Sequence, residues 1–242
     1  MQQSCGILCL GGTQLQKTLI FADIPFTAEP EDLDKNGLFE EDLQSEEVVS
    51  ILKEAIRIAH PKAVALPVEV LHDENGKVIA VGGQAMDSVV LDKNLKDLHR
   101  GFLFVATCGK ELEEYAQNIS REDNTWYLLY QLRLIALGAA RNYLLDQVKA
   151  RFDIPKLAAM NPGSLPEWPI TEQKKVFALL GEDADKIGVK LGDNMFMMPL
   201  ESASGLLFET EKAYQNCMIC TRLDCVGRHA PYDPELAKKF RG

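Results

Sequence analysis

The sequence NTWYLLYQLRLIALGAARNYLLDQVKAR, residues 124–151, is the longest helical pattern in a chain of 242 residues. It follows the apolar run FLFVAT at residues 102–107, whose length and whose branched and aromatic side chains are typical of a buried strand. Residues 134–140 of the helical pattern are apolar on all sides, so we expect the middle of this helix to be buried. A buried strand followed by one long buried helix is therefore the predicted centre of the fold.

Shorter patterns surround this pair. Helical spacing predicts a helix that begins after Ser45 and ends before Pro61, and further helices over 111–119 and 171–180. A hairpin is predicted where two apolar runs flank the turn sequence Asp73-Glu-Asn-Gly76. The expected strands, besides 102–107, cover residues 17–25, 63–71, 77–81, 88–91, 187–191, 195–198 and 205–208.

Strands and helices are mixed along the chain without a regular alternation. A doubly wound parallel sheet needs that alternation, so the order favours an α+β fold. Pro67 lies inside the first strand of the hairpin, where its missing N–H predicts an edge position or a bulge. Residues 211–242 show little regular pattern, so we expect a main domain over 1–210 followed by this extension.

The composition excludes several classes of protein. Apolar residues make up 46% of the chain, which is enough for a packed core. The net charge of −10 repels phosphate backbones, so nucleic acid is not an expected partner. No apolar run approaches the roughly 20 residues that span a bilayer, and no basic residue precedes the short apolar stretch at 7–10 as in a signal peptide. We therefore expect a cytoplasmic protein with no membrane partner.

Three of the six cysteines form a cluster near the end of the chain. Cys217, Cys220 and Cys225 have the spacing C-x2-C-x4-C, which brings three thiolates within reach of one metal ion or cluster. The spacing predicts metal binding, and it fits both zinc and an iron–sulfur cluster. The fourth ligand is open between His229, a cysteine elsewhere and a small exogenous ligand. The competing interpretation is that these are three unrelated thiols on a tail.

Two further motifs carry weaker predictions. Cys108 lies between the predicted strand and Gly109 at a helix start, where the pKa of a thiol can be lowered, so it is a candidate reactive thiol or fourth metal ligand. Packing as a small apolar side chain is the interpretation that its surroundings favour. The stretch from Gly11 to Thr18 resembles a phosphate-binding loop, but Gln16 stands where that loop needs a glycine, so nucleotide hydrolysis is not expected.

Three stretches of sequence carry a family resemblance. In their order and spacing they resemble the reactivation domain of cobalamin-dependent methionine synthase, most clearly over residues 158–209 and more broadly over about 17–209. The stretches are NPGSLPEWP (161–169) with TEQK (171–174), GVKL (188–191) with MMP (197–199), and SASGLLF (202–208).

The resemblance implies an α+β fold with a twisted antiparallel sheet and one long buried helix. It also implies that Pro162 and Gly163 belong to a loop that binds S-adenosylmethionine, and that the domain docks on a cobalamin domain. There such a domain supports the reductive methylation of cobalt that has slipped to the inactive Co(II) state. The sequence contains no recognisable methyltransferase or cobalamin module, so we expect a stand-alone protein that contacts cobalamin through a partner.

The chain departs from the family pattern in this loop. The family sequence reads R-x-x-P-G-Y, and here Ala159 and Ser164 stand in the places of the Arg and the Tyr. An arginine can hold a carboxylate through two hydrogen bonds, so its loss puts binding of S-adenosylmethionine in doubt. One extra residue also lies between Gly163 and Pro169, and the cysteine cluster is an addition to the family pattern.

The leading hypothesis is an accessory or reactivation protein that acts in trans on a corrinoid-dependent methyltransferase or methionine synthase. An iron–sulfur cluster at the C-terminal cysteines would deliver the electron that Co(II) reduction needs. One alternative is a methyltransferase that passes a methyl group between a corrinoid and a thiol or amine. Another is a binding module whose C-terminal segment is stabilised by zinc.

Overall fold

The computed structural model describes residues 17–33, 45–86, 88–118, 124–211, 214–224, 228 and 230–241. Its centre is a sheet of seven described strands in the order β4-β3-β2-β5-β9-β6, with β1 also paired to β2. Every neighbouring pair is antiparallel. The α+β class and the antiparallel sheet that the sequence predicted are therefore confirmed.

The strands and helices have the following bounds. The large sheet consists of β1 (Leu19–Phe21), β2 (Lys62–His72), β3 (Val78–Val81), β4 (Gln84–Ala85), β5 (Arg100–Thr107), β6 (Leu157–Met160) and β9 (Ser202–Glu209). A separate pair is formed by β7 (Lys190–Leu191) and β8 (Met197–Met198). The α-helices are α2 (Glu46–Ile58), α3 (Val89–Leu95), α4 (Lys110–Gln117), α5 (Asn124–Phe152), α6 (Gln173–Leu180), α7 (Glu182–Lys186) and α8 (Pro234–Arg241). Short 3-10 turns are η1 (Pro30–Asp32), η2 (Ile170–Glu172) and η3 (Asn216–Met218).

Alternate side chains of the central strands enter two separate cores. On one face Phe104 and Leu207 pack with residues of α5, in a cluster that also holds Leu144 and Val148. On the other face the neighbouring side chains pack with α3, α6, α7 and α8. Because successive side chains of a strand point to opposite faces, the nearly continuous apolar sequence of β5 serves both cores.

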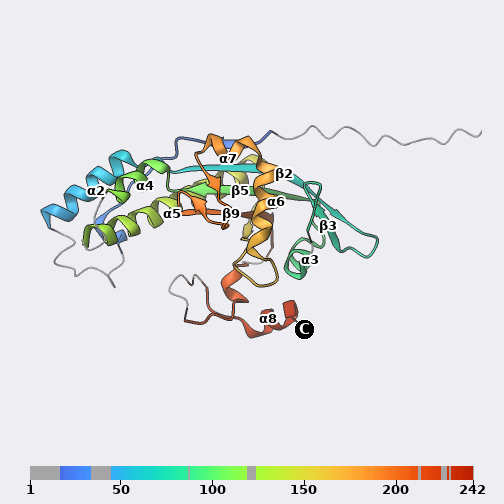
Figure 1. Ribbon diagram of the computed structural model, residues 1–242. Helices are drawn as coiled ribbons and strands as arrows, with labels where there is room; N and C mark the ends of the chain where they lie inside the picture. Colours follow the sequence, from blue (N-terminus) through green and yellow to red (C-terminus); the bar gives the residue numbers. More distant parts are fainter. Residues whose placement is uncertain are drawn as a thin grey trace, which may run out of the picture.

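Helices α2, α4 and α5 gather at one end of the molecule, and the hairpin of β2 and β3 extends from the other (Figure 1). The helical end has its own apolar cluster, to which α5 contributes Leu128, Leu132 and Ala136. The expectation that residues 134–140 are buried on all sides is wrong in one respect, because Leu134 is 43% exposed. The long helix is buried along one face and open to solvent along another.

Three predictions of local structure need correction. Residues 88–91 were expected to form a strand but begin helix α3, because the Ser88 hydroxyl accepts a hydrogen bond from the Leu91 amide and caps the helix. Strand β6 and helix α8 were not anticipated at all. Pro67 lies in an interior strand without a bulge at its position, opposite Phe102 of β5.

The position of Pro67 has a simple physical reason. The Val70 amide donates to His99 on the β5 side, and the Glu69 carbonyl accepts from Gly82 on the β3 side. Alternation along the strand therefore turns the Pro67 nitrogen away from β5. It faces the gap along β2 between Ala65, the last residue paired with β1 on that side, and Val70, the first paired with β3. No ladder hydrogen bond is lost there.

The C-terminal segment packs against the sheet face that carries α3 and α6. The ring of Tyr214 lies 6.0 Å from that of Phe208 on β9 and 5.9 Å from that of Phe240 on α8. The Asp233 carboxylate accepts from the Leu236 amide and caps α8, while the Asp233 amide donates to Met218. Among the described helices, none has the length and apolar character needed to cross a membrane.

Candidate functional site

The loop between β6 and η2, residues 161–169, is closed on itself. The Gly163 amide donates to the carbonyl of Trp168, and the Trp168 amide donates to that of Leu165. Gly163 has a φ of +83°, and a Cβ there would meet the Ile170 side chain at 2.8 Å, so only glycine fits without strain. Pro162 is buried and Gly163 is exposed. The two predicted binding residues thus lie in one rigid turn.

Polar side chains fasten this loop to strand β9. The Asn161 side-chain amide donates to the Ser204 carbonyl at 2.7 Å, and the buried Gln173 side chain donates to the Ser204 hydroxyl at 2.9 Å. The next residue, Gly205, lies so close to β6 that a Cβ would meet the Met160 carbonyl oxygen at 2.1 Å. These contacts fix the loop relative to the sheet and explain the sequence Ser204-Gly205 at this place.

Ala159, which stands where the family pattern has arginine, points to the face of the sheet covered by α5. It lines a recess of about 10 Å³ together with Arg141 of α5. The loop alone lacks the arginine that would hold the carboxylate of an adenosylmethionine-class ligand. Arg141 lines the same recess, but the recess has room for at most one water and its other walls are apolar, so Arg141 does not replace the missing arginine.

Two of the three predicted metal ligands lie on one turn. Cys217 belongs to η3, and the Cys220 amide donates back to the Cys217 carbonyl. Both residues are half-buried. Cys225, the third predicted ligand, and His229, the candidate fourth ligand, lie outside the described residues.

Arg228 holds the main chain around these cysteines. One terminal nitrogen donates to the carbonyls of Cys217 at 2.6 Å and Ala230 at 3.1 Å. The other donates to the carbonyls of Cys220 at 2.9 Å and Arg222 at 2.8 Å. A single guanidinium therefore joins both cysteine carbonyls to the chain that follows the cluster, and this fixes the turn that presents the two thiols.

The cysteine segment and the loop at 161–169 lie on the same side of the sheet. Tyr214, three residues before Cys217, is buried in the same apolar cluster as Leu165 and Trp168 of the loop. Burial raises the pKa of the Tyr214 hydroxyl to about 12, and the nearby Glu167 carboxylate acts in the same direction. The two regions that the sequence singled out independently are thus neighbours in the structure.

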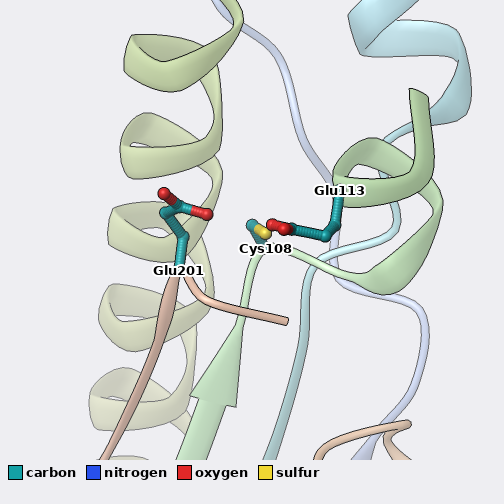
Figure 2. Close-up of side chains that lie close together, drawn as sticks. All are labelled: Cys108, Glu113 and Glu201. Carbon is teal, nitrogen blue, oxygen red and sulfur yellow. The ribbon is translucent and has the colours of Figure 1, made fainter. Parts of the chain in front are cut away.

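A third cluster was not predicted as a unit. Cys108, Glu113 and Glu201 are buried, and their sulfur and carboxylate oxygens lie within 4.8 Å of one another. Figure 2 shows the two carboxylates approaching the thiol from α4 on one side and from the start of β9 on the other. Arg133 of α5 lies between them, with a terminal nitrogen 2.8 Å from Glu113 and 3.0 Å from Glu201.

The electrostatics of this cluster argue against a reactive thiol. Burial raises the pKa of the Cys108 thiol far above its ordinary value, and the carboxylates of Glu201 and Glu113 raise it further. Burial also raises the pKa of the Glu201 carboxyl to about 7, Arg133 opposes that rise, and a hydrogen bond with Glu113 adds to it. The Arg133 guanidinium balances the charge of one carboxylate, and the raised pKa of Glu201 lets a proton balance the other, so no added cation is needed.

One feature of the sequence indicates a buried ionic cluster here. Arg133 is the single charged residue in an apolar run from 125 to 140, and a cation in the buried part of a helix needs an anionic partner. Which carboxylates supply that charge depends on packing of α4 and β9 against α5. These residues are far apart in the sequence, and no local pattern relates them.

The comparisons with known proteins support the fold. A scan of protein families and a search of curated proteins both returned no match. Among solved structures, the chain is similar to the MetH reactivation domain bound to AdoHcy, with a TM-score of 0.52 and 19% sequence identity over 83% of this chain and 81% of that one. The chain therefore has the fold of a methionine synthase reactivation domain, as its sequence predicted.

Proposed function

We propose that this protein is an accessory protein that acts in trans on a corrinoid-dependent methyltransferase or methionine synthase and supports reactivation of its cobalt. The observation that carries the proposal is the likeness of fold to the MetH reactivation domain, which extends over 81% of that chain. A shared fold is an argument by analogy, so the residues must supply the rest.

The loop at 161–169 supports a role in ligand binding. It keeps the Pro162-Gly163 turn of the family pattern, and its attachment to Ser204 gives it the rigidity that a binding site needs. The solved structure of the related fold holds AdoHcy. We therefore extend the proposal to an adenosylmethionine-class ligand, for which Pro162 and Gly163 would form part of the binding surface.

The cysteine segment supports a metal or redox role beside that loop. Cys217 and Cys220 offer two soft sulfur donors from one turn, and Cys225 is the proposed third ligand. An iron–sulfur cluster here would supply a single electron at low potential, whereas zinc would only stabilise the segment. Because Tyr214 anchors the segment near Glu167, the cluster would lie on the same side of the protein as the loop.

Binding to a corrinoid protein tests the proposal. The purified protein should be titrated by isothermal calorimetry, under anaerobic conditions, with the corrinoid protein of the same host in the Co(II) and methylated states. We expect a complex that is tighter in the Co(II) state, since that is the state to be repaired. No complex in either state would overturn the proposed function, whatever metal the cysteines hold.

Metal analysis tests the redox part separately. Protein prepared without oxygen should contain iron and sulfide and absorb broadly near about 400 nm, as thiolate-bound iron does. Cys217→Ser and Cys220→Ser should lose that absorption, while Cys108→Ser should retain it, because Cys108 is buried in a different cluster. Zinc at about one ion per chain would rule out electron delivery and leave the docking role intact.

A further inference from the structure

An open recess of about 260 Å³ lies at the end of the sheet where β5 begins and β9 ends. Its volume far exceeds the ~10–15 Å³ that one water needs and is slightly below the roughly 300–1,000 Å³ of sites for small molecules. Two of its lining residues, Phe102 and Ile154, belong to the apolar cluster on the α5 face of the sheet. The loop at 161–169 packs its Leu165 and Trp168 on the other face, so the recess is a separate place on the molecule.

The recess has an apolar floor and a wall that hydrogen bonds hold in place. Phe102 and Ile154 are buried, and Leu98 is half-buried. The wall, residues 97–99, joins α3 to β5, and backbone hydrogen bonds tie it to the last residue of α3 on one side and to β2 on the other. A ligand would therefore meet a preformed surface and would not lose affinity to the ordering of a loop.

Arg100 is the cation of this recess, and two aromatic rings orient it. Its guanidinium carbon lies 5.5 Å from the ring centre of Phe102 and 5.1 Å from that of Phe152. Glu69 of β2 pairs with Arg100, and the register of β5 and β9, continued to their ends, places Glu209 opposite Arg100 on the other side. Even so, no carboxylate among the described residues forms an ion pair with Arg100. The guanidinium is thus fixed in direction and available to an anionic group.

The charges that line the recess match a zwitterion. Asp97 and Glu209 contribute two carboxylates, and Arg100 contributes one guanidinium. A ligand with only negative charge would be repelled by the carboxylates, and one with only positive charge would be repelled by the guanidinium. An α-amino acid carries its ammonium and its carboxylate on one carbon, so both groups can meet opposite charges at once. The apolar floor suits an aliphatic side chain.

We propose that this recess binds a free α-amino acid with an apolar side chain. Arg100 holds the carboxylate of the amino acid, and Glu209 and Asp97 hold its ammonium group. The side chain packs against Phe102 and Ile154. A carboxylate suits Arg100 because a planar guanidinium can donate two parallel hydrogen bonds to it. The inference does not depend on the proposed function.

The test compares L-leucine with two analogues that each lack one charged group. Isoamylamine keeps the ammonium group and lacks the carboxylate, whereas isocaproate keeps the carboxylate and lacks the ammonium group. In titrations followed by two-dimensional NMR, L-leucine should cause saturable shifts of the backbone amides of residues 97–102 and of Ile154. It should bind at least about 10-fold more tightly than either analogue, because each analogue gives up one charge-assisted contact.

Two variants assign the charged groups of the recess. Arg100→Gln should weaken L-leucine binding about 10-fold, the low end for a charge-assisted contact because Arg100 is exposed, and should not weaken isoamylamine. Glu209→Gln should weaken L-leucine by a smaller factor, since Asp97 remains, and should not weaken isocaproate. Arg57→Gln is the matched control, an exposed arginine on α2, and should change none of the three affinities.

Three results would overturn the inference. They are the absence of a saturable shift with L-leucine, equal L-leucine affinity of the unaltered protein and Arg100→Gln, and equal affinity for L-leucine and isocaproate, since the recess would then recognise an anion alone. Unchanged melting temperatures of the variants would show that a loss of binding does not come from unfolding. Binding of L-leucine and binding of the corrinoid protein are measured separately, so either result stands if the other fails.

Discussion

Among single residues, Arg133 is the cation that two buried carboxylates share. Its guanidinium is 6% exposed and contacts the equally buried carboxylate of Glu113 and that of Glu201. These three side chains come from α4, α5 and the segment that leads into β9, so the cluster ties the helical end of the molecule to its sheet. A complete buried ion pair adds little net stability, but removing one partner leaves an unpaired buried charge, which strongly destabilises the fold.

Arg133→Met tests this dependence. The substitution keeps the volume of the side chain and leaves Glu113 and Glu201 buried without a cation, so it should lower the free energy of unfolding by about 3–5 kcal/mol. Urea denaturation at pH 7.5 measures the change. Arg57→Met is the matched control, since Arg57 pairs with Glu54 on the surface and should alter stability much less. Similar small changes for both variants would contradict this account of the cluster.

Glu201 should make stability depend on pH. Its pKa is about 7 in the folded protein against an ordinary value of 4.5, so between these values the folded state binds more protons than the unfolded state. The contribution of Glu201 to stability is therefore fully present below about pH 4.5 and is lost as the pH rises through 7. Glu201→Gln cannot titrate, so its free energy of unfolding should decline less between pH 5 and pH 8.

Denaturation curves at several pH values check that prediction. The groups that face Glu201 are Arg133 of α5, Glu113 of α4 and the Cys108 thiol, whose pKa is raised by burial so that it stays neutral over this range. The difference between the two proteins therefore reports the shared proton of the carboxyl pair. Parallel pH profiles for the unaltered protein and Glu201→Gln would contradict the raised pKa.

Among the secondary-structure elements, strand β6 shows where local sequence signals fail. Its residues, Leu157–Met160, include alanine, leucine and methionine, which favour helices, and the run is too short to display a period of two. It becomes a strand because it pairs with β9, and Gly205 permits the close approach. Tertiary pairing overrides propensity here, so the sequence alone could not reveal the element that carries Ala159.

Gly205→Ala should therefore be severe. A Cβ would lie 2.1 Å from the Met160 carbonyl oxygen, which belongs to the backbone and cannot move without unpairing β6. We expect a loss of about 4 kcal/mol or more in the free energy of unfolding. Gly138→Ala in α5 is the matched control, because no atom lies within 4 Å of the added Cβ, and it should stabilise the protein by up to about 1 kcal/mol. A small change in the free energy of unfolding for Gly205→Ala would contradict the close approach of β6 to β9 at this residue.

In the cysteine turn, the sequence predicts the candidate ligands but not the residue that holds them in place. The spacing of Cys217, Cys220 and Cys225 was legible in the sequence, whereas Arg228, whose guanidinium holds the turn, belongs to no recognisable metal-binding pattern. Its four acceptors are backbone carbonyls, which sequence patterns do not report. Helix α8 was also not predicted. Its start at Asp233-Pro234 follows an irregular segment, and only two of its apolar side chains, Ala237 and Phe240, are buried.

Arg228→Met should reduce metal occupancy. Without the guanidinium, four carbonyls each lose one hydrogen bond and the two thiols are no longer held in one arrangement, so the proposed metal should dissociate faster to a chelator. Arg222→Met is the matched control, because only the backbone carbonyl of Arg222 takes part in the turn. Elemental analysis and the rate of metal loss give the readout. Equal occupancy and equal rates in the two variants would mean that Arg228 does not organise the site.

For the protein as a whole, the order of motifs predicted more than any single motif did. The stretches at 161–169, 188–199 and 202–208 indicated the reactivation-domain fold, and the solved structure of that domain matches over 83% of this chain. The departure of Ala159 from the family pattern is visible in the sequence, whereas the position of Arg141, which lines the same recess from a helix, is not. Contacts between elements distant in sequence had to come from the structure.

Reactivation of a corrinoid protein in solution is the decisive measurement of the proposed function. The corrinoid protein of the same host, held in the Co(II) state, should be mixed anaerobically with S-adenosylmethionine and a low-potential one-electron reductant, with and without this protein. Absorption spectra then follow the conversion of Co(II) corrinoid to the methylated form. We expect the conversion to require this protein or to be accelerated many-fold by it. Equal rates with and without the protein would contradict the proposed function.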